Sequence, residues 1–105
     1  MTKFTLADLE KRVQERAHQS AAESYTRSLI DKGLAHCGKK LNEEAYETAL
    51  AAVQEDDDRV IAETADLLYH LLVLLQARGV TLAQVEAELE KRTKQSGHQE
   101  KASRG

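Results

Sequence analysis

The chain has 105 residues, is 41% hydrophobic and 31% charged, and carries a formal net charge of -3. This length suits one domain rather than two, and the charge argues against a nucleic-acid binder that neutralises phosphates over a broad basic surface. Because Cys37 is the single cysteine, an internal disulfide and a thiolate metal cluster are excluded. We therefore expect the protein to be located in a reducing cytoplasm.

The first two predicted helices lie in the N-terminal third. The first begins at Thr5, with Asp8 placed as in a capping box, and runs to about His18. Charged residues interrupt this region before any apolar run forms, so we expect no secretory signal. The second predicted helix covers residues 23–33 and ends at Gly33, where we expect a turn.

The third predicted helix covers residues 34–54 and contains apolar residues at a helical period. They are Leu41, Ala45, Ala49, Ala52 and Val53. Because alanine side chains are small, this pattern predicts that the helix approaches a neighbour closely.

Acidic residues separate the third predicted helix from the fourth. The sequence EDDDR, residues 55–59, favours a turn with a helix N-cap, because acidic groups complement the partial positive charge at a helix N-terminus. The fourth predicted helix covers Arg59 to Arg78 and ends at Gly79, and a fifth starts at Thr81. No apolar run approaches the roughly 20 residues of a membrane span.

These elements predict an all-α fold: a small antiparallel bundle of four to five helices. The segment DLLYHLLVLL, residues 66–75, is apolar on nearly every side, and a domain of this size covers such a helix poorly. We therefore expect a homodimer or a larger homo-oligomer to complete the bundle. Residues 1–93 form the predicted domain, and residues 94–105 are a polar tail that we expect to be disordered.

Two carboxylate pairs are candidate metal ligands. Glu44 and Glu47 share a face of the third helix, and Glu63 and Asp66 share a face of the fourth, because residues three apart are neighbours on a helix. Asp66 enters an apolar stretch in which burying an unpaired carboxylate would be costly. A hard divalent cation would compensate, so the four acids predict a site for Mg²⁺ or Mn²⁺.

Lys39 and Lys40 precede these acids by one helical turn. Ammonium groups beside a metal–carboxylate cluster suit a polyphosphate, which favours hydrolysis of a phosphate ester or anhydride. The alternative is a solvated helix face, because Lys39–Glu43 and Lys40–Glu44 are also ordinary i,i+4 pairs.

Iron chemistry is disfavoured by the ligand types. A di-iron bundle needs Glu-x-x-His on two helices, and only Glu15 to His18 matches. His70 continues the Asp66 stripe, but we interpret it as a core or interface histidine because nitrogen ligands do not suit Mg²⁺. Cys37 is interpreted as an inert small residue.

Four segments of the chain resemble the phosphoribosyl-ATP pyrophosphatase family of histidine biosynthesis, within the all-α nucleoside triphosphate pyrophosphohydrolases. They are SYTRSL (24–29), KGLAHCGKKLNEEAYETALAA (32–52), ETADLLYHLLVLL (63–75) and GVTLAQVEAEL (79–89). The shared signature of that superfamily, E-x-x-E followed by E-x-x-D, falls on Glu44, Glu47, Glu63 and Asp66. One departure is Asn42, where the family usually has glycine.

The resemblance implies Mg²⁺-dependent hydrolysis of 1-(5-phosphoribosyl)-ATP to 1-(5-phosphoribosyl)-AMP and pyrophosphate, by a stand-alone enzyme without a fused cyclohydrolase. Glu43 and Glu44 are then candidate catalytic residues. Lys39 and Lys40 are candidates for binding the triphosphate.

Three further residues, Tyr25, Thr26 and Arg27, are candidate substrate contacts near a subunit boundary. The sequence is also compatible with two alternative functions. One is a house-cleaning pyrophosphohydrolase for non-standard nucleoside triphosphates, and the other is a non-catalytic helical dimerisation module.

Overall fold

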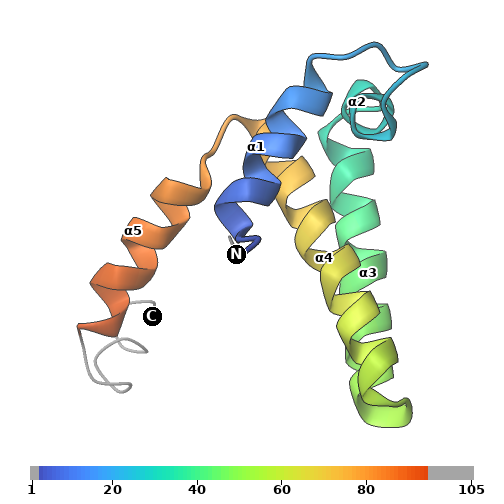
Figure 1. Cartoon of the computed structure of the whole chain (residues 1–105), viewed down its shortest axis with the longest axis vertical. Coiled ribbons are helices and arrows are strands. Elements are labelled where there is room, and N and C mark those ends of the chain that lie inside the picture. The colour runs from blue at the N-terminus through green and yellow to red at the C-terminus, as the bar shows by residue number, and fades with distance from the viewer. Residues whose placement is uncertain (1–2, 95–105) are drawn as a thin grey trace.

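The computed structural model describes residues 3–94 and is all-α in that range, which confirms the predicted class (Figure 1). The helices are α1 (Leu6–Ala17), α2 (Tyr25–Asp31), α3 (Leu34–Gln54), α4 (Asp57–Arg78) and α5 (Leu82–Thr93). Residues 95–105, most of the predicted polar tail, lie outside the described residues.

Side-chain caps fix where the helices start. The Thr5 hydroxyl accepts from the Asp8 backbone N–H at 3.2 Å, and the Asp8 carboxylate accepts from the Thr5 N–H at 2.9 Å, so the predicted capping box is confirmed. In α4 the Asp56 carboxylate accepts from the Arg59 N–H at 3.0 Å. The capping role of the acidic run is therefore confirmed, but the predicted start at Arg59 was two residues late.

Glycines with positive φ separate the later helices. Gly33 (φ 99°) precedes α3, and Gly79 (φ 83°) ends α4 in the left-handed conformation, as expected for a C-terminal glycine. Ser24 caps α2 by accepting from the Arg27 N–H at 3.0 Å. As a result α2 is shorter than the predicted segment 23–33.

The antiparallel pair α3–α4 is the framework of the fold, and its two helices make the most extensive contact (Figure 1). Helix α1 lies across α4 and α2 covers one end of the pair. Helix α5 lies apart from the hairpin. Near the start of α5, the Leu82 N–H donates to the carboxylate of Glu10 on α1 at 2.7 Å. The buried core consists of Val13, Leu29, Cys37, Leu72 and Val73.

Of the five apolar residues predicted to form one face of α3, only Leu41 lies on the side that α3 turns inward. Ala45, Ala49 and Ala52 are exposed, and Val53 is 82% exposed. The buried and half-buried residues form a neighbouring stripe, centred about 100° around the helix from these exposed residues. They are Cys37, Leu41, Glu44, Thr48 and Ala51. Both stripes have a helical period, so periodicity alone could not choose between them.

Helix α4 is the one helix in residues 3–94 whose length and composition would allow a membrane span. Core helices of soluble proteins meet the same criterion. In this fold α4 contacts α1, α2 and α3, and its side chains Leu72 and Val73 are buried in the core.

The packing of α2 can be tested at Leu29, which is 2% exposed. Leu29→Ala should lower the free energy of unfolding by about 2 to 5 kcal/mol, because it removes buried methyl groups and leaves a cavity. Leu34→Ala, at a position 46% exposed, should cost less than half as much. Urea unfolding measures both, and equal losses would contradict the described core.

Candidate metal centre

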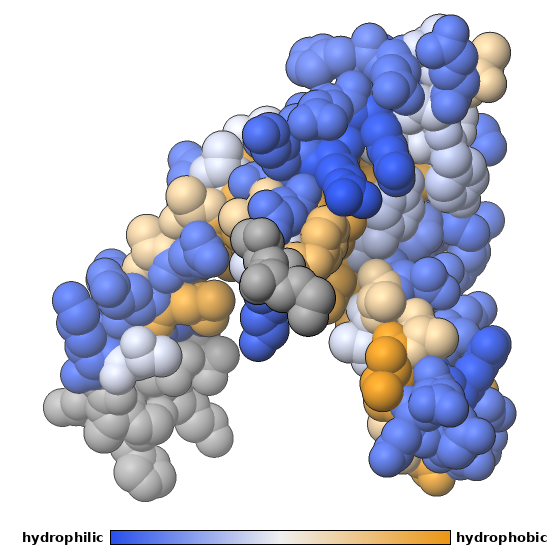
Figure 2. Space-filling view, in the orientation of Figure 1, coloured by the Kyte–Doolittle hydropathy of each residue, from blue (hydrophilic) through white to orange (hydrophobic). Residues whose placement is uncertain are grey.

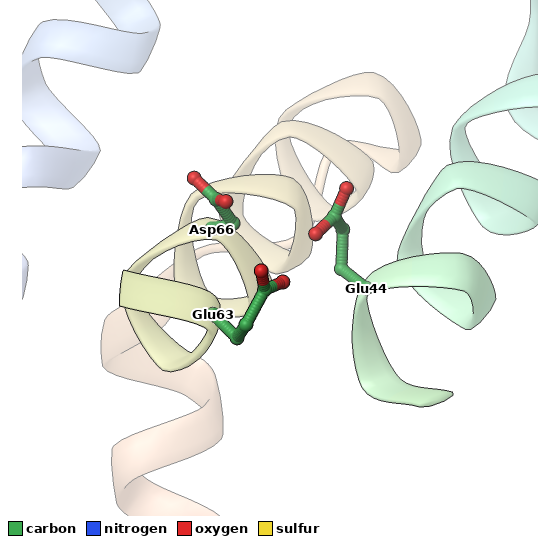
Figure 3. Close-up of side chains that lie close together, drawn as sticks. All are labelled: Glu44, Glu63 and Asp66. Carbon is green, nitrogen blue, oxygen red and sulfur yellow. The ribbon is translucent and has the colours of Figure 1, made fainter. Parts of the chain in front are cut away.

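Three carboxylates from two helices converge in the seam between α3 and α4 (Figure 3). Glu44 comes from α3, and Glu63 and Asp66 come from α4. One oxygen from each lies within 4.8 Å of the others. Because two oxygens on opposite sides of one Mg²⁺ lie about 4.2 Å apart, this spacing is close to what a single hard cation needs.

Burial differs among these acids, and it differs from expectation. The predicted burial of Asp66 was wrong, because its side chain is exposed, whereas Glu63 is only 5% exposed and Glu44 is half-buried. Successive residues turn by about 100° around a helix, so Asp66 lies about 60° away from Glu63, toward the rim of the seam. The seam thus has a buried end at Glu63 and an open side at Asp66.

Two carboxylate oxygens in the seam lack hydrogen-bond partners. Glu44 Oε2 and Glu63 Oε2 are buried and accept no hydrogen bond from any described residue. Burial raises the pKa of Glu63, and the neighbouring Glu47 and Asp66 raise it further, while Arg59 opposes the rise. Buried oxygens without donors, on acids that repel one another, fit a divalent cation bound by oxygen ligands.

The fourth predicted ligand, Glu47, lies at one side of this group. Its carboxyl group is near enough to Glu63 to influence the pKa of that residue. It does not belong to the group of three that converges within residues 3–94. Glu47 instead lines a pocket of about 160 Å³ together with Leu50, Ala51, Glu55, Arg59 and Glu63.

The two lysines occupy different environments. Lys40 is half-buried and its Nζ lies 3.2 Å from Glu43 Oε2. This hydrogen bond is the main cause that raises the pKa of Lys40, with smaller contributions from Tyr25 and Glu44. The predicted i,i+4 partner Glu44 is thus replaced by Glu43, at i,i+3. Lys39 is exposed and forms no ion pair with a described residue.

His70 lies in the wall of the seam, 7% exposed, as expected for a core histidine. Its Nε2 is 3.9 Å from Glu44 Oε1, and its ring packs edge-on against Tyr69. Burial lowers the pKa of His70, although the negative charge of Glu44 opposes this. The ring lies beside a candidate ligand, and its burial disfavours the charged form.

The three candidate substrate contacts on α2 have different surroundings. Tyr25 is 59% exposed. Thr26 is buried and its hydroxyl is 2.6 Å from that of Tyr69. Arg27 donates to the Ala17 carbonyl at 3.0 Å and pairs with Asp31 at 2.8 Å. Tyr25 thus faces solvent, whereas the other two side chains are engaged within the protein.

Two residues near the acids were not singled out from the sequence. The Thr48 hydroxyl lies 2.8 Å from the Glu44 carbonyl of its own helix and 3.0 Å from the Glu63 carbonyl, so its one proton is shared between α3 and α4 beside the seam. Arg59 Nη2 lies 2.8 Å from Glu63 Oε1. The i,i+4 spacing of Arg59 and Glu63 could have indicated the second contact, but the first joins two helices and has no local signal.

Comparison with known proteins gives consistent matches. The model of the family described as phosphoribosyl-ATP pyrophosphohydrolase matches residues 6–93. Similar proteins include the phosphoribosyl-ATP pyrophosphatase of Azorhizobium caulinodans, 65% identical over 97% of this chain and 94% of that protein. Phosphoribosyl-ATP pyrophosphatase 1 of Bradyrhizobium diazoefficiens is 57% identical over 99% of this chain and 98% of its own length.

Burial and the neighbouring acids disfavour the charged form of Glu63, so removing this charge should stabilise the metal-free protein. Without metal, Glu63→Gln should raise the thermal unfolding midpoint at neutral pH, because an amide suffers less from burial and from the neighbouring acids. Glu88→Gln is the matched control: Arg92 lowers the pKa of Glu88, so this change should lower the midpoint slightly. Calorimetry in the presence of a chelator measures the unfolding midpoints of both variants. A lower midpoint for Glu63→Gln than for the wild type would contradict the idea that the Glu63 charge destabilises the metal-free protein.

Proposed function

This chain belongs to the phosphoribosyl-ATP pyrophosphohydrolase family of histidine biosynthesis and is a hydrolase, and from that premise we propose that it cleaves 1-(5-phosphoribosyl)-ATP to 1-(5-phosphoribosyl)-AMP and pyrophosphate with Mg²⁺ bound in the α3–α4 seam. The observation that supports the metal is the pair of buried, unpartnered oxygens on Glu44 and Glu63. Mn²⁺ has the same preference for oxygen ligands and would replace Mg²⁺.

Glu44, Glu63 and Asp66 would hold the cation, and Glu47 would assist from the neighbouring turn of α3. When bound, the cation neutralises phosphate charge and activates water. The exposure of Asp66 leaves the seam open on one side, where the triphosphate can approach. Thr48 lies between the Glu44 and Glu63 carbonyls and would help to hold α3 and α4 together beside these ligands.

Glu43 and Lys40 would act at the rim of the same site. In the free protein they pair with each other at 3.2 Å. A triphosphate would compete for the Lys40 ammonium group, and this would release the Glu43 carboxylate to accept a proton from water. Lys39, which is exposed, would contribute to the positive charge that attracts the triphosphate.

Tyr25 would contact the rest of the nucleotide. It lines a pocket of about 440 Å³ with Arg16, Thr26, Tyr69 and other polar residues. Lys40 lies near enough to both Tyr25 and Glu44 for each to raise its pKa slightly. Thr26 and Arg27 would support the position of Tyr25 through their internal hydrogen bonds.

A turnover assay tests the reaction. Purified protein with Mg²⁺ should release pyrophosphate from phosphoribosyl-ATP, and Glu44→Gln, Glu63→Gln and Asp66→Asn should each lower kcat by about 100-fold or more, beyond what residues that only support a ligand contribute. Glu88→Gln is the control: Glu88 is on α5, outside the α3–α4 seam, so this variant should have the wild-type kcat.

Two outcomes would favour the other functions. Faster turnover of non-standard nucleoside triphosphates than of phosphoribosyl-ATP would indicate a house-cleaning enzyme. No hydrolysis, together with no stabilisation by Mg²⁺ and nucleotide, would indicate a helical dimerisation module.

We also propose that the protein works as a homodimer or larger homo-oligomer in the cytoplasm. Apolar side chains remain exposed on the outer faces of the hairpin, at Tyr46, Leu50, Val53 and Ile61. Figure 2 shows apolar surface at the end of the hairpin where α3 meets α4, and also on α5. Exposed apolar side chains that gather on one part of a protein often mark an interface. Cys37 is buried and unpaired, which suits a reducing compartment.

Charge placed on this surface should separate the subunits. Val53→Asp and Ile61→Asp should reduce the mass measured by light scattering to that of a single chain, because a carboxylate is costly to bury in an apolar interface. Lys32→Glu, an exposed position at the end of α2, is the control and should leave the mass unchanged. A wild-type protein that is monomeric at every concentration would contradict the proposed assembly.

A further inference from the structure

Arg59 contacts the most buried of the three converging carboxylates. Its Nη2 lies 2.8 Å from Glu63 Oε1, whereas Glu63 Oε2 has no hydrogen-bond partner among the described residues. The Glu63 side chain is 6% exposed and the Arg59 side chain 58% exposed. One oxygen of a buried carboxylate is therefore held from the solvent side, and the other is left free.

The backbone of Arg59 is itself fixed. Its N–H donates to the capping Asp56 carboxylate at 3.0 Å, so the residue lies in a well-defined first turn of α4. Its Nε lies 3.8 Å from Glu55 Oε2 on the other side of the cap. The guanidinium group thus extends one turn along α4 from an anchored position, and its planar shape sets the direction of the hydrogen bond to Glu63.

We propose that Arg59 is a positioning residue that holds Glu63 by one oxygen, so that this carboxylate offers only its other oxygen to the cation shared with Glu44 and Asp66. The inference rests on the proposed metal site. A carboxylate bound through one oxygen occupies one position of an octahedral Mg²⁺ and leaves more positions for water and phosphate oxygens than a bidentate one.

A different role for Arg59 would be a counter-ion that substitutes for the metal in the free protein. In that case the guanidinium would occupy the position of the cation, and its removal would strengthen metal binding. The geometry favours positioning, because the oxygen that Arg59 contacts is Oε1 and the unpartnered, buried oxygen is Oε2. Both contacts can exist at once, so Arg59 need not leave when a cation binds.

Metal binding without substrate distinguishes the two roles. Metal-free protein is titrated with Mn²⁺, and free Mn²⁺ is measured by electron paramagnetic resonance. Arg59→Met, which keeps the aliphatic part of the side chain but removes the donors, should weaken Mn²⁺ binding by about tenfold, as expected when a group that orients a ligand is lost. Arg59→Lys, which keeps one charged donor, should recover part of the loss.

Arg92→Met is the matched control, because Arg92 forms the same kind of i,i+4 pair with Glu88, at 2.9 Å, on α5. It should leave Mn²⁺ binding unchanged. Binding by Arg59→Met that is equal to or tighter than wild type would overturn the positioning role. The proposed function fails separately, if wild-type protein binds no Mn²⁺ or if Glu63→Gln binds it as well as wild type.

Discussion

The packing of α3 against α4 brings negative charge into a seam where it has too few partners, and the rest of the site depends on this arrangement. Glu63 is buried in that seam and Glu44 is half-buried, yet each has an oxygen that no described donor reaches. An apolar pair of side chains would stabilise the free protein better. The arrangement is understandable if a cation joins the two helices when the enzyme works.

The groups around the seam either hold the helices or hold the acids. The Thr48 hydroxyl lies within hydrogen-bond distance of backbone carbonyls on both α3 and α4, and Arg59 contacts Glu63 from the solvent side. The buried His70 ring lies beside Glu44, with its Nε2 3.9 Å from Glu44 Oε1. These contacts limit the movement of carboxylates that would otherwise repel one another, so the seam is preorganised although its charges oppose folding.

A chain of this size also leaves apolar surface that it cannot cover. Helix α5 makes no contact as extensive as that between α3 and α4, and α3 turns a stripe of alanines to the outside. Small side chains allow close approach of a second helix. The alanine stripe of α3 is left exposed within one chain.

The sequence by itself determined the helical class, the cap at Thr5, an acidic N-cap before α4, the glycine ends, and the sharing of a helix face by Glu63 and Asp66, because these depend on neighbours within one turn. It also carried the family signature. Only the tertiary structure decided which face of α3 is inside, that Glu63 rather than Asp66 is buried, and that Glu47 lies beside the converging three. These features depend on the rotation of one helix against another, and a helical period repeated on two faces leaves that rotation undefined until the helices pack.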